Sequence, residues 1–113
     1  MKVLHLGAGN IFGGIETALI AYAAGRRKCE EMVPYFALCF PGQLEAELRR
    51  QNVNVTILGP VRLSRRRSVT AARRGLGALI RHNRPDVILT HGSWVHSVFA
   101  PLAKAEGIPT ALF

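Results

Sequence analysis

Residues 2–24 read KVLHLGAGNIFGGIETALIAYAA, and this stretch decides the fold class. An apolar run over residues 2–8, typical of a buried strand, leads into the glycine-rich segment GNIFGGIET at residues 9–17. An Ala-rich run follows, and its apolar spacing predicts a helix over residues 15–28. A strand that turns into a helix through a glycine-rich loop is the opening unit of a parallel α/β sheet.

The rest of the chain continues the same alternation. The apolar patterns predict four more strands, over residues 33–40, 53–59, 86–90 and 109–113, and three more helices, over residues 43–51, 68–83 and 96–106. Short connections between alternating elements predict an α/β fold with a Rossmann-like parallel sheet and helices on both faces. We expect a single domain over residues 1–113. Because no helix follows the last predicted strand to cover it, we also expect the domain to be truncated at its C-terminus, as in a fragment.

The composition favours a globular, cytoplasmic protein. With 49% apolar and 19% charged residues, the chain falls outside the disordered class, and 113 residues suit one domain with a modest core. Asn10 and Glu16 interrupt the N-terminal apolar run, unlike a signal peptide, and no other stretch approaches the ~18 apolar residues of a membrane span. Cys29 and Cys39 lack the spacing of a metal or redox site, so we expect reduced thiols.

The glycines of residues 9–17 are typical of a loop that binds an anion. Without a Cβ atom, Gly13 and Gly14 would let the backbone approach a phosphate while the first N–H groups of the next helix point at it. Glu16 would lie in the first helical turn, where a carboxylate suits the helix dipole and can orient a hydroxyl. Phe12 holds the third position of a GxGxxG fingerprint, and no P-loop motif occurs, so neither nucleotide class is indicated. The alternative is that these glycines only form a tight turn.

Four segments, in this order, resemble the retaining glycosyltransferases of the GT-B type known as family 4. GGIETALIAYA resembles the Gly-Gly-x-Glu start of that family's first helix, and PGQLEAEL resembles its G-x-L-x-x-x-L element. RPDVILTHGSW resembles its P-D-hydrophobic-H strand, and AEGIPTALF resembles its G-I-P-hydrophobic fifth strand. The resemblance covers almost the whole chain and implies that it is the N-terminal, acceptor-side domain of such an enzyme.

The resemblance also implies a reaction and a set of site residues. Members transfer a sugar from a nucleotide sugar to a hydroxyl acceptor, with retention, at a cleft between two Rossmann-like domains. Gly13 and Gly14 match the glycine loop near the donor diphosphate and the acceptor, and His91 and Ser93 match the segment that borders the acceptor side. The donor-binding second domain has no counterpart in this chain, so we expect no transfer by the chain alone and assign no catalytic residue. The nucleotide sugar is a substrate, no cofactor is implied, and the lack of a DxD motif or ligand cluster predicts no metal.

Residues 62–84 carry the whole excess of positive charge, with eight arginines and no acid. The helical pattern leaves Arg67, Arg74 and Arg81 opposite the apolar stripe and places Arg62 and Arg65 in the preceding loop. Three interpretations stay open: an ordinary solvated helix face, contact with an anionic membrane at its inner face, and nucleic-acid binding, which the lack of interleaved aromatics disfavours. The two loop arginines could instead meet an acidic or phosphorylated acceptor. The rival function is therefore a non-catalytic module that binds anionic lipid or nucleic acid.

The histidines and the single tryptophan give weaker signals. His91 is predicted at the carboxyl edge of the sheet, where functional residues collect, whereas His5 within the first strand is more typical of a core histidine. His96 is predicted to begin the last helix. Trp94 is predicted in the same loop as His91, where its ring could stack on a sugar or fill a helix interface.

Overall fold

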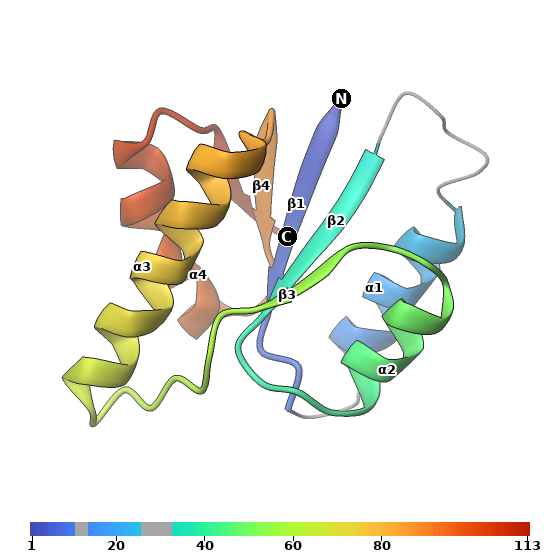
Figure 1. Ribbon diagram of the computed structural model, residues 1–113, viewed down its shortest axis with the longest axis horizontal. Helices are drawn as coiled ribbons and strands as arrows, with labels where there is room; N and C mark the ends of the chain where they lie inside the picture. Colours follow the sequence, from blue (N-terminus) through green and yellow to red (C-terminus); the bar gives the residue numbers. More distant parts are fainter. Residues whose placement is uncertain (11–13, 26–32) are drawn as a thin grey trace.

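The computed structural model describes residues 1–10, 14–25 and 33–113, which form a parallel sheet between two pairs of helices (Figure 1). The elements in chain order are β1 (Lys2–Gly7), α1 (Gly14–Gly25), β2 (Val33–Leu38), α2 (Gln43–Arg50), β3 (Val55–Ile57), α3 (Arg66–Asn83), β4 (Val87–Thr90), α4 (Ser93–Ala105) and β5 (Thr110–Leu112). The strands pair in the order β3-β2-β1-β4-β5, all of them parallel. This architecture confirms the predicted Rossmann-like α/β fold.

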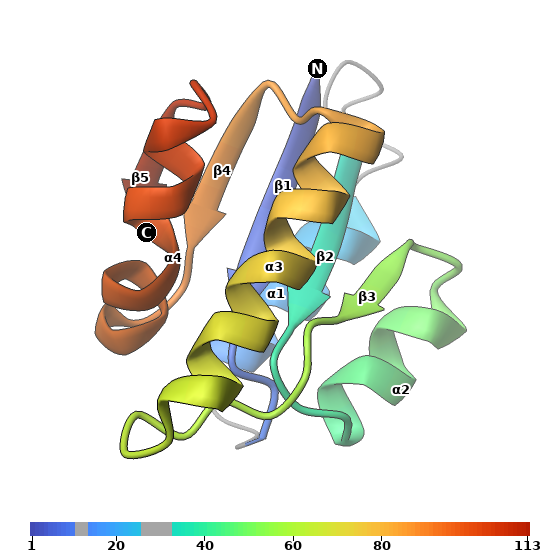
Figure 2. The same cartoon turned by 60° about the vertical axis from the view of Figure 1, so that its left-hand side comes forward.

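Two apolar layers hold the sheet between its helices. Helices α3 and α4 lie on one face and α1 and α2 on the other (Figures 1 and 2). Side chains alternate between the faces along each strand. Leu4 and Leu6 of β1 are therefore buried in the layer under α3 and α4, while Phe36 and Leu38 of β2 are buried under α1 and α2.

All nine predicted elements are present, and the differences lie at their ends. The largest concerns α4, which begins at Ser93 and not at His96. The predictions that Trp94 lies in the loop and that His96 begins the helix are therefore wrong, since both residues are inside α4. Gly92 explains the early start, because its φ of 108° turns the chain at the second residue after the strand. The predicted helical residues beyond Gly25, and Cys29, lie outside the described part of the chain.

The amphipathic pattern of α3 is confirmed. Ala72, Leu76 and Ile80 are fully buried against the sheet. The side of the helix that faces away from the sheet is basic. All eight arginines of residues 62–84 are exposed. The helix therefore presents its charge to solvent while its apolar stripe completes the core.

Strand β5 forms one edge of the sheet, and the chain ends directly beside it. Leu112 and Phe113 are 51% and 63% exposed. In the described residues, no helix has the length and apolar content needed to cross a membrane.

Candidate functional site

The carboxyl ends of the parallel strands meet at one edge of the sheet, and glycine turns lead away from it. Gly9, after β1, has a φ of 86°, and Gly92, after β4, has a φ of 108°. A Cβ atom on Gly9 would lie 2.7 Å from the carbonyl oxygen of Phe40, whereas one on Gly92 would meet nothing within 4 Å. The loop after β1 is therefore packed tightly against the loop after β2, and the turn after β4 is open.

Two histidines form a buried pair beneath this edge. Nδ1 of His5, in β1, lies 3.0 Å from Nε2 of His91, the first residue after β4. Their exposed fractions are 4% and 3%. Burial lowers the pKa of His91 to about 4, and burial together with the neighbouring His91 lowers the pKa of His5 to about 4. Both rings are therefore neutral at pH 7, and a single N–H is donated from one ring to the other.

The pair belongs to a row of aromatic rings that crosses the sheet on the face of α1 and α2. Ring centroids are 5.1 Å apart between Phe36 and His5, 5.2 Å apart between His5 and His91, and 5.2 Å apart between His91 and Phe113. The backbone N–H of His91 also donates to the carbonyl oxygen of Leu6 at 2.8 Å. The His91 ring is thus fixed inside the molecule by stacking and by a continued strand ladder.

The turn after β4 carries an accessible side chain at this edge. Ser93 is exposed and begins α4 directly after Gly92, so the first N–H groups of that helix point outward at the edge. Behind the turn, Oγ1 of Thr90 lies 2.7 Å from Nδ1 of His96 and donates to the carbonyl oxygen of Ala111 at 3.2 Å. The Thr90 hydroxyl therefore links α4 to β5 and holds the start of the helix.

The structure brings together part of the predicted site. His91 and Ser93 lie at the same turn, as the sequence predicted. Gly14 is the first residue of α1. Gly13 lies outside the described residues, and so does the side chain of Glu16.

Two side chains at this edge have roles that the sequence did not indicate. His5 is the partner of His91, although 86 positions separate them in the chain. His96 bonds to Thr90. The contact between His5 and His91 could be predicted only from the register of β1 with β4, which places His5 opposite Leu89. Trp94 packs partly buried against the core, which favours its role at a helix interface.

The described residues offer no evident place for a metal ion. Across residues 1–10, 14–25 and 33–113, no three side chains among His, Cys, Asp and Glu gather closely enough to bind one. Cys39 is a free, buried thiol, and burial raises its pKa to about 12. At neutral pH it is protonated and unreactive.

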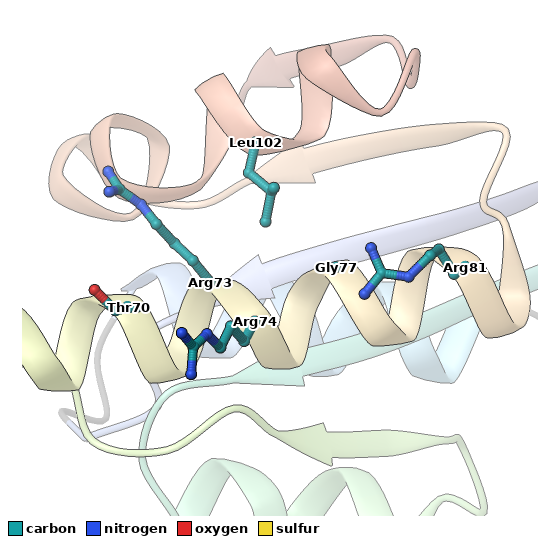
Figure 3. Close-up of a pocket in the computed structure, with 6 residues that line it drawn as sticks. All are labelled: Thr70, Arg73, Arg74, Gly77, Arg81 and Leu102. Atoms are coloured by element: carbon teal, nitrogen blue, oxygen red, sulfur yellow. The ribbon is translucent and has the colours of Figure 1, made fainter.

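Two of the predicted arginines, Arg74 and Arg81, line a surface groove between α3 and α4 (Figure 3). One part of the groove, of about 290 Å³, is lined by Thr70, Arg73, Arg74, Gly77, Arg81 and Leu102. The other part, of about 410 Å³, is lined by Leu63, Arg66, Val69, Thr70, Arg73, Ser97 and Val98. Arg62, Arg65 and Arg67 line neither part. Of the predicted arginines, Arg74 and Arg81 therefore line the groove. Two arginines that were not predicted, Arg66 and Arg73, line it as well.

Solved structures of known proteins share this fold. The chain is similar to MurG from Acinetobacter baumannii, with a TM-score of 0.77 and 16% identity, in a match that covers 98% of this chain and 34% of that protein. The whole chain matches a UGT transferase from Siraitia grosvenorii solved with UDP, with a TM-score of 0.66 and 15% identity, and covers 28% of it. Both are GT-B glycosyltransferases. The C-terminal domain of a hydrogenase from Pyrococcus furiosus also matches 99% of the chain, with a TM-score of 0.65 and 13% identity, and is covered to 90%.

These likenesses show a Rossmann-like α/β fold for this chain, which spans about a third of MurG and less of the UGT transferase. No protein-family model matches the sequence. No curated protein shows significant similarity to it. Because the hydrogenase domain has the same fold, the fold alone does not determine the activity.

Proposed function

We propose that this chain is the acceptor-side domain of a retaining, family 4 glycosyltransferase, which transfers a sugar from a nucleotide sugar to a hydroxyl acceptor. One observation carries the proposal: the family-like segment RPDVILTHGSW lies at the carboxyl edge of a sheet whose fold is that of GT-B enzymes. Ligands of doubly wound sheets bind at this edge. The position of His91 and Ser93 directly after β4 supports their assignment to this site.

The donor diphosphate is assigned to the loop between β1 and α1. Gly13 and Gly14 would contact the diphosphate through backbone N–H groups, and Glu16 would orient a hydroxyl. The start of α1 at Gly14 supports this assignment, because a helix N-terminus stabilises the negative charge that develops on a leaving diphosphate.

The acceptor is assigned to the turn after β4. Ser93 is exposed there, whereas His91 is only 3% exposed and is held by His5. In this proposal Ser93 and the N-terminus of α4 meet the acceptor hydroxyls. His91 is a positioning residue that fixes the turn from below.

Transfer further requires the donor-binding domain of a GT-B enzyme, so the proposal includes such a domain as the partner of this chain. The test starts with the gene sequence downstream of the codon for Phe113. If a second α/β domain is encoded, the complete protein is assayed with a panel of nucleotide sugars for release of the nucleoside diphosphate, alongside Ser93→Ala. Sugar-dependent release that falls in the variant supports the proposal. A stop codon, together with no binding of UDP or nucleotide sugars to the chain in ligand-observed NMR, would contradict it.

A second candidate is favoured by the exposed charge of residues 62–84. We infer a peripheral contact with an anionic membrane through Arg62, Arg65, Arg67, Arg74 and Arg81, either in the transferase or in a non-catalytic module. Leu63, 64% exposed in the same loop, supports this contact, because an apolar side chain among arginines suits a lipid interface. Nucleic acid remains the disfavoured partner, since stacking aromatics are absent from residues 62–84.

Vesicle binding tests the membrane contact. Cosedimentation with anionic and with neutral vesicles, with and without a competing nucleotide sugar, separates lipid binding from donor binding. The triple change of Arg67, Arg74 and Arg81 to Gln is expected to abolish most binding to anionic vesicles. Unchanged binding of that variant would show the membrane contact to be wrong.

A further inference from the structure

Thr90 determines which ring nitrogen of His96 carries the proton. The hydroxyl oxygen of Thr90 lies 3.2 Å from the carbonyl oxygen of Ala111 and 2.7 Å from Nδ1 of His96. A hydroxyl has one proton to donate, whereas a carbonyl oxygen only accepts. The proton of Thr90 is therefore directed to Ala111, and the Nδ1–H group of His96 donates to the Thr90 oxygen.

This tautomer leaves the other ring nitrogen of His96 as an acceptor. A neutral imidazole has one N–H group, so with the proton on Nδ1 the Nε2 atom carries a lone pair. His96 is half-buried, and within the part of the chain that the structure describes its Nε2 atom has no hydrogen-bond partner. In that part, the phenol oxygen of Tyr35 is the only side-chain oxygen or nitrogen that is both buried and without a partner. Nε2 of His96 is therefore accessible to solvent.

The ring of His96 lies near the exposed hydroxyl of Ser93. The two residues are three positions apart at the start of α4, so their side chains share one face of the helix. The Ser93 hydroxyl can donate as well as accept a hydrogen bond, whereas Nε2 of His96 in this tautomer only accepts. The start of α4 thus offers both kinds of partner to a sugar hydroxyl, which itself donates one hydrogen bond and accepts others.

The lone pair of Nε2 also distinguishes a hydroxyl from an anion. An ionised phosphate oxygen only accepts hydrogen bonds, so it forms none with Nε2 in the neutral ring of His96. A helix N-terminus without such an acceptor beside it would attract an anion. The Nδ1–H form of His96 therefore favours a neutral hydroxyl compound at the turn after β4.

From these observations we infer that His96 is an acceptor-binding residue, whose Nε2 atom accepts a hydrogen bond from a hydroxyl group of a neutral, sugar-like acceptor. Thr90 is a positioning residue, because it acts only through the ring of His96. This inference rests on the proposed function and refines it, since it adds a second side chain to the acceptor site at Ser93 and specifies the chemical group bound there. The hydrogen bond orients the acceptor hydroxyl, and the ring of His96 stays neutral.

The tautomer is tested on the chain itself. Ring-nitrogen NMR at about pH 8, where a histidine of ordinary pKa is neutral, distinguishes the protonated nitrogen from the unprotonated one. His96, assigned with the help of His96→Asn, is expected to carry its proton on Nδ1. Thr90→Val removes the hydroxyl and should shift the proton to Nε2, whereas Thr90→Ser keeps the hydroxyl and the tautomer. A proton on Nε2 in the unchanged chain, or the same tautomer in Thr90→Val, would overturn the inference.

Hydroxyl probes then test binding at Nε2. The chain is titrated with the methyl glycosides of glucose, galactose, mannose and N-acetylglucosamine, with tetrahydropyran, which is the sugar ring without hydroxyls, and with inorganic phosphate. A methyl glycoside is expected to shift the Nε2 resonance of His96 toward that of a hydrogen-bonded nitrogen, whereas tetrahydropyran and phosphate leave it in place. Glycoside responses no larger than that of tetrahydropyran, or a larger response to phosphate, would contradict the inference.

Kinetics on the complete protein separate this inference from the proposed function. His96→Asn keeps a side-chain N–H near the position of Nδ1 but has no atom in the place of Nε2. The loss of one hydrogen bond should raise the acceptor KM about three- to tenfold, while the donor KM changes less than about twofold. His82→Asn, in the last turn of α3, is the matched control and should change neither constant. Thermal melts confirm that both variants fold.

Each kinetic result has a distinct meaning. If nucleoside diphosphate is released and the acceptor KM of His96→Asn is unchanged, the inference is wrong and the proposed function stands. If the unchanged protein releases none, the proposed function fails, and the glycoside titration decides whether His96 binds a hydroxyl.

Discussion

The histidine pair at the sheet edge and the arginine groove between α3 and α4 differ in how their polar groups are held. His5 and His91 are buried, neutral, stacked and bonded to each other, so their chemistry exists only in the folded chain. The groove arginines are exposed, and their charge is present whether or not the chain is folded. From this difference we expect changes to the histidine pair to act through stability, and changes to the exposed charges of Arg74 and Arg81 to act through binding. Substitutions can test this separation.

The largest effect on stability is expected from Gly9→Ala, with Gly92→Ala as its match. Both glycines have positive φ, a conformation that costs other residues about 1–3 kcal/mol. Only at Gly9 does a Cβ atom also meet a backbone carbonyl, at 2.7 Å, which adds about 1–3 kcal/mol of overpacking. We therefore expect losses of about 2–6 kcal/mol at Gly9 and about 1–3 kcal/mol at Gly92, measured by urea denaturation. Equal losses in the two variants would mean that the loop after β2 can move away from a Cβ atom on Gly9 at little cost.

The pH dependence of stability is expected to show the next effect. The pKa of each histidine is about 4 in the folded chain and about 6.5 in the unfolded chain, so between these values the unfolded chain binds more protons. The two histidines therefore do not reduce the free energy of unfolding above pH 6.5, and they reduce it progressively as the pH drops from 6.5 toward 4. With two such histidines the slope reaches at most about 2.7 kcal/mol per pH unit.

The variant His91→Gln tests whether the histidine pair causes this pH dependence of the free energy of unfolding. His91→Gln removes one of the two buried groups that take up a proton on unfolding, so it is expected to reduce the slope by about half. Denaturation at pH 4.5, 5.5, 6.5 and 7.5 measures each slope, values chosen to bracket the titration range of about 4 to 6.5. An unchanged slope in His91→Gln would show that other groups dominate the acid response.

The sequence predicted the fold because local patterns carry it. Apolar strands such as residues 33–40 and the apolar stripe of α3 depend on spacing alone. Element ends were harder to place. Helix α4 begins three residues before its predicted start because Gly92 makes the turn by itself, and no side chain caps the helix.

The site was only partly predictable because it depends on which strands are neighbours. Ser93 was identified only through the resemblance to family 4, and His91 both through that resemblance and from the edge at which β4 ends. The His5–His91 pair follows from the placement of β4 next to β1, and the groove follows from the packing of α3 on α4. Both are contacts between segments distant in sequence, which periodicity within one segment does not encode.

In the groove, Gly77→Ala is expected to stabilise the chain. Alanine gains about 1 kcal/mol over glycine inside a helix, and the 3.3 Å contact it makes is with the flexible tip of Arg81, which can move. Gly75→Ala is the control, because its new atom would make an ordinary contact of 3.5 Å with Leu58. Both variants should raise the urea midpoint by similar amounts. If Gly77→Ala destabilises, Arg81 is held more rigidly than an exposed side chain should be.

The smallest effects are expected from two adjacent arginines of α3. Arg73→Gln loses the bond to the Val98 carbonyl oxygen and should cost about 0.5–1.5 kcal/mol, whereas Arg74→Gln should change the free energy of unfolding by less than about 0.5 kcal/mol. A larger loss at Arg74 would tie it to the fold and weaken the contrast with the sheet edge. If Arg74→Gln instead leaves stability unchanged and reduces binding to anionic vesicles, then its positive charge serves a partner. That result would separate binding from folding at Arg74, because this exposed charge would then contribute to binding and not to the free energy of unfolding.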